Sequence, residues 1–176
     1  RSFGIHVQSD LPVGQVAISN GPENASVDHF TIRVQGKRAH VSTPEKGVDA
    51  LYAAAQIVVA LQGIVTRLVA PTDPALIGVG VLRAGEGYNI VAQDAVIEGT
   101  VRCFSPETRA LISRKIKETA DNVAVTLGAS AEVKIESAYT MKDEVEACSS
   151  ARVSFVTSPA GMRTRFSSTP FRFSAV

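Results

Sequence analysis

Hydrophobic and polar side chains alternate along three segments of the chain, which is the pattern of strands with one buried face. The segments are residues 29–35, 95–104 and 131–136. A fourth segment, residues 76–82, is apolar on both faces and precedes a turn that contains two glycines. The sequence therefore predicts four strands.

Two longer segments repeat apolar residues at spacings of three and four, which is the period of an amphipathic helix. The first lies between Gly47 and Val69 and is closed by Pro71. The second begins at Ser105, whose hydroxyl suits an N-cap; a proline and an acidic residue follow it. It ends before Gly128, because glycine readily adopts the left-handed conformation found after helix ends. The repeating apolar positions are Leu51, Ala54, Val58, Leu61, Val65 and Leu68 in the first helix and Ile112, Ile116, Val123 and Leu127 in the second.

The order strand, helix, strand, strand, helix, strand predicts an α+β, ferredoxin-like β-α-β-β-α-β sandwich. We expect a four-stranded antiparallel sheet with both helices on one face, because right-handed crossovers return the helices to the same side. The uncovered face then carries Arg33, Glu98, Thr100 and Arg102. This fold hosts regulatory, RNA-binding and oligomerisation modules alike, so function must come from particular residues.

The flanks differ from this core in composition. Residues 1–24 contain strand-like stretches around a turn and are expected to belong to a neighbouring domain and its linker, and residues 25–141 form the predicted domain. After Glu146 no acidic residue occurs, and arginines lie among serines, threonines and phenylalanines. Residues 142–176 are therefore an atypical tail, either a remnant of another domain or disordered.

Charge and cysteine content narrow the class of protein. The 176 residues carry a net charge of +1, with 18 basic and 17 acidic residues, which gives no reason to expect nucleic acid or an anionic membrane as a partner. No uninterrupted apolar run approaches the ~20 residues of a membrane span. Cys103 and Cys148 lack a C-x-x-C spacing and are either two free thiols or a disulfide. We expect a reducing, cytoplasmic compartment.

Common catalytic motifs are absent from the sequence. The three histidines, His6, His29 and His40, have no partners at a spacing that would complete a metal site, and there is no nucleophile elbow, P-loop or dinucleotide-binding turn. The remaining candidate is the segment at residues 36–44, between the first strand and the first helix, where ordered loops tend to carry function.

Three motifs in this order resemble those of the M20 family of metal-dependent amidohydrolases and peptidases, which includes aminoacylases and hippurate and indoleacetyl-amino-acid hydrolases. They are Gly36-Lys37-x-Ala39-His40-x-Ser42-x-Pro44-x-x-Gly47-Val48-Asp49-Ala50, Gly85-x-Gly87-x-Asn89-Ile90-Val91 and Ala95-x-Ile97-x-Gly99-Thr100-x-Arg102. Upstream, Gly4-Ile5-His6-Val7 is similar to a stretch that leaves the family's catalytic domain. The resemblance covers roughly residues 3 to 140 and identifies the core as a dimerisation (lid) domain.

The resemblance implies roles for four residues. In that family the lid domain pairs with its copy in a second subunit and presents polar side chains to the partner's active site. His40 would donate to the oxyanion of the tetrahedral intermediate, and Asn89 and Arg102 would hold the carboxylate or amide of the substrate. His6 matches a metal ligand, for zinc or manganese in the full-length enzyme. We expect this chain by itself to bind no metal stably.

Each of these residues also has a purely structural interpretation. His40 could be an ordinary loop histidine, Asn89 could adopt a left-handed turn conformation, Arg102 could be a solvated charge on an open sheet, and His6 could be a structural residue of a strand. His29 is expected to lie on the surface.

The sequence also departs from the family. Its other metal ligands and its glutamate pair have no counterpart in this chain, and Ala92 stands where the family often has proline. The resemblance therefore implies a homodimeric lid domain of an enzyme that cleaves amide bonds of N-acyl amino acids or similar small substrates, and an isolated chain that is inactive. The alternative is a free-standing ferredoxin-like module for homodimerisation or small-molecule regulation. An RNA-binding sheet is disfavoured because the third strand has an aromatic residue, Phe104, only at its end.

Overall fold

A computed structural model of the chain describes residues 25–139. Within them the elements are β1 (Val27–Gln35), β2 (Ala39–His40), a short 3₁₀-helix (Pro44–Lys46), α1 (Ala50–Leu68), β3 (Ala75–Ala84), β4 (Ile90–Val91), β5 (Asp94–Cys103), α2 (Pro106–Thr126) and β6 (Ser130–Tyr139). His6, Cys148 and both flanks lie outside the described residues.

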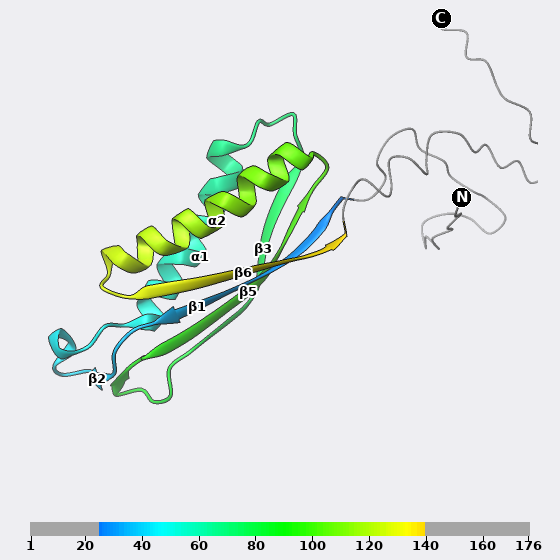
Figure 1. Ribbon diagram of the computed structural model, residues 1–176. Coiled ribbons are helices and arrows are strands. Elements are labelled where there is room, and N and C mark those ends of the chain that lie inside the picture. Colours follow the sequence, from blue (N-terminus) through cyan, green and yellow to red (C-terminus); the bar gives the residue numbers. More distant parts are fainter. Residues whose placement is uncertain (1–24, 140–176) are drawn as a thin grey trace, which may run out of the picture. The chain divides into compact units, whose positions relative to one another are not determined.

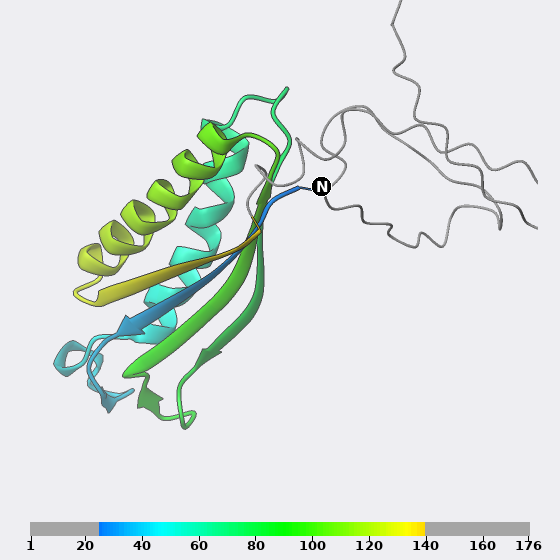
Figure 2. The same ribbon diagram turned by 45° about the vertical axis from the view of Figure 1, so that its right-hand side comes forward.

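The main sheet has four antiparallel strands in the order β3-β5-β1-β6. Both helices cover one face of it, α1 over β3 and β5 and α2 over β6, and the other face carries no helix of the described part of the chain (Figures 1 and 2). This is the predicted ferredoxin-like sandwich. A small two-stranded sheet of β2 and β4, which the periodicity of the sequence did not predict, extends from the end of β1.

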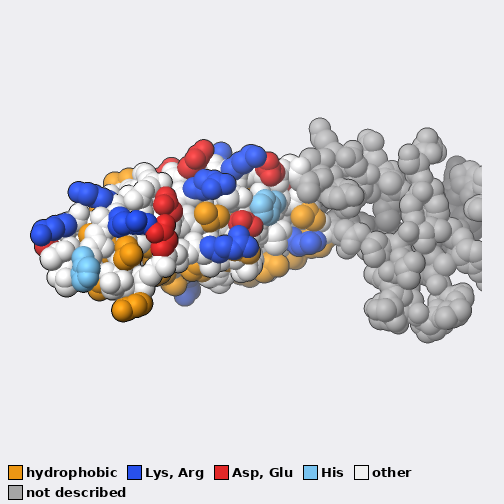
Figure 3. Space-filling model, turned by 90° about the horizontal axis from the view of Figure 1, so that it is seen from below, with side chains coloured by type: hydrophobic (Ala, Val, Ile, Leu, Met, Phe, Trp, Pro, Cys, Tyr) orange, Lys and Arg blue, Asp and Glu red, His pale blue; other side chains and the backbone are white. Residues whose placement is uncertain are grey.

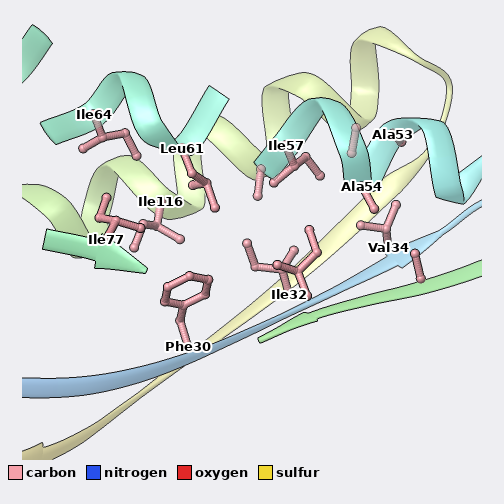
Figure 4. Packing of buried hydrophobic residues seen from close by; sticks show 14 of the residues in the cluster. Phe30, Ile32, Val34, Ala53, Ala54, Ile57, Leu61, Ile64, Ile77 and Ile116 are labelled. Atoms are coloured by element: carbon pink, nitrogen blue, oxygen red, sulfur yellow. The ribbon is translucent and has the colours of Figure 1, made fainter. Parts of the chain in front are cut away.

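The core lies between the helices and the sheet (Figure 4). Phe30, Ile32 and Val34 of β1 point towards the inner face of α1, which buries Ile57 and Leu61. The predicted stripe of α1 is wrong at its ends, because Leu51 and Leu68 are 47% and 50% exposed. The helix instead turns its alanines and isoleucines inward: Ala50, Ala53, Ala54, Ile57, Leu61 and Ile64 are its buried residues. In α2, Ile112 and Ile116 are buried as predicted, and Val123 and Leu127 are partly buried against the same core.

Side chains cap the starts of both helices; the sequence predicts Ser105 and Gly128 at the ends of α2, whereas the Asp49 cap of α1 appears only in the structure. The Asp49 carboxylate accepts hydrogen bonds from the backbone N–H groups of Leu51 and Tyr52, at 2.9 and 3.1 Å. The Ser105 hydroxyl accepts from Thr108 N–H at 3.2 Å. Gly128, after α2, has a φ of 76°.

Helix α1 is apolar enough to meet a composition test for membrane spans, with a mean hydropathy of 1.5 over its 19 residues, although Gln62, Thr66 and Arg67 interrupt its apolar run. Core helices of globular domains pass the same test, and six residues of α1 are buried in the core. The apolar inner face of the helix is explained in part by its packing against α2 and against the sheet.

Candidate functional site

Two of the three sequence motifs meet at the small β2–β4 sheet. His40 in β2 is paired with Ile90 in β4, and the backbone N–H of Val41 donates to the carbonyl oxygen of Asn89 at 3.1 Å. Arg38 forms an ion pair with Glu86 across the same two segments. The fold therefore brings His40 and Asn89 together from positions 49 residues apart in the sequence.

The glycines of the first motif hold this segment against the body of the domain. The backbones of Lys37 and Val48 exchange two hydrogen bonds of 2.8 Å. A Cβ on Gly36 would lie 2.2 Å from the carbonyl oxygen of Val48, and one on Gly47 would lie 2.8 Å from the carbonyl oxygen of Lys37. Glycine is required at both positions because the two backbone segments approach so closely. The loop is thus pinned at both of its ends.

The imidazole of His40 is exposed, and its orientation is set by Ser42. Nδ1 lies 2.7 Å from the Ser42 hydroxyl and accepts a hydrogen bond from the Ser42 backbone N–H at 3.2 Å. The carbonyl oxygen of His40 accepts from Thr43 N–H at 2.9 Å, which closes a tight turn. Nε2 is therefore the ring nitrogen left to interact with a substrate.

Asn89 is exposed beside His40 and does not adopt a left-handed conformation. Among residues 25–139 only glycines have positive φ, and in this turn it is Gly85, with a φ of 77°. Asn89 lies in a turn, but the interpretation that it adopts a left-handed conformation there is wrong. The neighbouring Tyr88 is 99% exposed.

Arg102 lies at the other end of the sheet. Gln35, which leads into the His40 segment, is paired with Asp94, and Arg102 is eight residues further along β5. At roughly 3.3 Å per residue the separation along the strand is about 26 Å. The structure thus brings His40 and Asn89 together and does not bring Arg102 to them within one copy of the chain.

The rest of the third motif has a structural explanation. A Cβ on Gly99 would lie 2.3 Å from Cζ of Phe30, and the Thr100 hydroxyl donates to the carbonyl oxygen of Asp28 at 3.0 Å. Arg102 makes no such contribution: its side chain is exposed on the sheet face that the helices leave open. On the face seen in Figure 3, charged side chains of both signs are interspersed.

A hollow of about 250 Å³ lies beside the β2–β4 sheet, lined by residues that include Arg38, Arg83 and Glu86. His40, Asn89 and Arg102 do not line it. Within residues 25–139 there is also no group of three or more His, Cys, Asp or Glu residues placed to hold a metal ion. The described residues therefore do not fit a metal site, and we derive no chemical step through one.

The exposure of the candidate donors to water decides whether they can stabilise a charge. Hydrogen-bond donors stabilise a developing negative charge strongly only where water is excluded. His40, Asn89 and Arg102 are all exposed in residues 25–139, so within this part of the chain they do not form an enclosed site.

Comparison with known proteins agrees with this geometry. The sequence profile of the M20 peptidase dimerisation domain matches residues 23–127. N-acetylcysteine deacetylase of Bacillus subtilis is 37% identical over 132 residues, which are 75% of this chain and 35% of that protein. N-acetyldiaminopimelate deacetylase of Streptococcus suis is 32% identical over 133 residues, 76% of this chain and 36% of that protein.

Solved structures give the same result. A putative aminohydrolase from methicillin-resistant Staphylococcus aureus superposes with a TM-score of 0.72 at 28% identity, covering 76% of this chain and 36% of that chain. A dinuclear metal-binding peptidase of the M20 family from Bacillus subtilis has a TM-score of 0.57 at 32% identity, with coverage of 75% and 31%. The chain spans about a third of the length of these proteins, and it belongs to the M20 peptidase family as a dimerisation domain.

Proposed function

We propose that this domain is the lid of a metal-dependent amidohydrolase that cleaves the amide bond of N-acyl amino acids or related small substrates. The observation that carries the proposal is the exposed His40 ring, held by Ser42 at Nδ1 and not at Nε2, in a strand that pairs beside Asn89. Two of the relatives are deacetylases of N-acylated amino acids, which supports this substrate class. The ligands of the metal, which is zinc or manganese, and the general base are supplied by residues outside 25–139.

We further propose that the functional unit is a homodimer formed through β3. Among the described residues β3 pairs only with β5, so its outer edge is free to pair with another strand. Leu76 and Leu82 on this strand are 53% and 46% exposed, and the neighbouring helix α1 exposes Tyr52 and Val59. Apolar side chains next to an open strand edge favour association with a second copy.

Such a dimer also resolves the distance between Arg102 and His40. Residue Ala84 of β3 lies at the end of the sheet near His40, and Ala75 lies at the Arg102 end. Antiparallel pairing of two β3 strands about a two-fold axis puts the His40 end of one copy beside the Arg102 end of the other. A single substrate then meets the donors of one copy and the guanidinium of its partner, which matches a carboxylate bidentately.

A chimera tests the catalytic part of the proposal. Residues 25–139 replace the matching segment of the Bacillus subtilis N-acetylcysteine deacetylase, and turnover and bound metal are measured together. We expect His40→Gln to lower kcat by about 10²- to 10³-fold, the effect of losing one oxyanion donor, with metal content unchanged. His29→Gln, on the open sheet, serves as the matched control and retains full turnover.

Two outcomes would contradict the proposal. One is an equal loss of turnover and metal in the His40→Gln chimera, which would make His40 a ligand or a structural residue. The other is hydrolysis of N-acyl amino acids by the purified 176-residue chain in the presence of zinc or manganese, because we expect that chain to be inactive alone.

A further inference from the structure

The turn from His40 to Thr43 fixes the main chain and the side chain of His40 separately. Its main chain is held by the β2–β4 pairing and by the 2.9 Å hydrogen bond from Thr43 N–H to the His40 carbonyl oxygen. Its ring is held by Ser42, through the 2.7 Å contact to Oγ and the 3.2 Å contact to the backbone nitrogen. Rotation of the ring would break both contacts of Nδ1.

The contact to the Ser42 backbone determines which ring nitrogen carries the proton. A backbone N–H can only donate, so Nδ1 must be the acceptor. A neutral imidazole has one donor and one acceptor nitrogen, so its proton then lies on Nε2. In that tautomer the Ser42 hydroxyl, which can rotate and lies 2.7 Å away, donates to the same Nδ1.

We propose that Ser42 is a positioning residue that holds neutral His40 in the Nε2–H tautomer. Nε2–H is then a hydrogen-bond donor on an exposed ring, in place before a substrate arrives. The catalytic benefit rests on the proposed role of His40 at an oxyanion, since a donor fixed in advance needs no reorganisation during the reaction. The tautomer itself follows from the turn geometry alone.

The tautomer can be measured directly on the 176-residue chain. Nitrogen-15 NMR correlation of the histidine side chains, at a pH where the rings are neutral, distinguishes protonated from unprotonated ring nitrogens. Signals are assigned with His6→Gln, His29→Gln and His40→Gln variants. We expect His40 to show a protonated Nε2 and an unprotonated Nδ1. A protonated Nδ1 would overturn the proposal.

Variants of the turn separate positioning from general structural effects. Ser42→Ala removes the donor at 2.7 Å and leaves the one at 3.2 Å, so we expect a larger Nδ1–H fraction for His40; Ser42→Thr keeps the hydroxyl and restores the tautomer. Thr43→Val is the matched control, because within residues 25–139 the Thr43 hydroxyl donates to the His40 carbonyl oxygen and not to the ring. Identical ring spectra for wild type and Ser42→Ala would show that the hydroxyl does not position the ring.

Kinetics in the deacetylase chimera complete the test. We expect Ser42→Ala to lower kcat and to leave KM unchanged. The loss of kcat should be smaller than the about 10²-fold caused by removing the donor itself, and Ser42→Thr should recover it. If the NMR result holds but His40→Gln does not affect turnover, the catalytic role of His40 fails and the positioning by Ser42 stands. If His40→Gln is inactive but the tautomer is Nδ1–H, the positioning fails alone.

Discussion

At the scale of single residues, most of the family motif holds the loop rather than contacting a substrate. Gly36 and Gly47 allow two backbone segments to touch, Gly99 leaves room for the Phe30 ring, and Asp49 caps α1. At Gly36, Gly47 and Gly99 these close approaches leave no room for a side chain. His40, Asn89 and Arg102 are among the motif residues that these packing requirements leave unexplained.

Gly99→Ala tests this account of the third motif. A Cβ there would lie 2.3 Å from the Phe30 ring and 2.4 Å from the carbonyl oxygen of Gly78. We expect the free energy of unfolding to fall by about 1–3 kcal/mol, the usual cost of overpacking, measured by urea denaturation. Gly63→Ala in α1 is the control: nothing lies within 4 Å of its Cβ, and replacing a helical glycine stabilises by roughly 0.5–1 kcal/mol. Equal effects of the two variants would contradict the packing argument.

Cys103 should make the domain less stable at alkaline pH. Burial raises the pKa of this thiol above its ordinary value of 9.0, although a hydrogen bond with Ser26 opposes the shift. Above pH 9.0 the unfolded thiol loses its proton while the folded thiol keeps it, so unfolding is increasingly favoured as pH rises towards the folded pKa. We expect urea midpoints of the wild type to fall over this range more steeply than those of Cys103→Ala. Parallel pH profiles would show that Cys103 is not responsible.

At the scale of elements, the sequence predicts those whose pattern is long. The four strands of the main sheet and both helices follow from periodicity and capping residues. Strands β2 and β4 have only two residues each, which is too short for any period, so their pairing appears only in the structure. The predicted stripe of α1 is wrong only at Leu51 and Leu68, because the helix is apolar nearly all round and its periodicity does not mark where the inner face ends.

The start of α1 offers a test at this scale. Asp49 accepts two backbone hydrogen bonds there. Asp49→Ala should lower the free energy of unfolding by about 0.5–2 kcal/mol, the range for loss of an N-cap, and Asp49→Asn should retain most of the stability. Thermal unfolding followed by circular dichroism measures both. Asparagine and alanine variants of equal stability would mean that capping contributes little.

At the scale of the whole molecule, the sequence did not reveal that Arg102 and His40 lie at opposite ends of the sheet. Residues 36–44 follow β1, and Arg102 is near the end of β5, but the separation depends on the antiparallel register of these two strands. Motif matching places all three candidate residues in one site without saying which copy of the chain supplies each. If all three residues act on one substrate, as we propose, this register requires that two copies of the chain supply them.

The proposed dimer predicts that the average molecular mass in solution rises with the concentration of the chain. Sedimentation equilibrium of the 176-residue chain should show a dimer that Leu82→Lys disrupts, because a charge beside an exposed strand edge opposes pairing. Val125→Lys is the control, since Val125 is 72% exposed on α2, away from β3. A chain that stays monomeric at all concentrations would contradict the arrangement.

The pairing of β1 with β6 also sets how the domain is connected. Val27 is paired with Tyr139, so the chain enters and leaves the sheet at adjacent points, at the end far from His40. Strand β1 has nine residues, so at roughly 3.3 Å per residue it spans about 30 Å between the entry points and the His40 end of the sheet. A rotation of about 10° at the two entry points would carry His40 through about 5 Å, on the scale of a whole side chain. In the proposed enzyme, a small change of angle at these two entry points would therefore decide whether the His40 donor reaches a substrate.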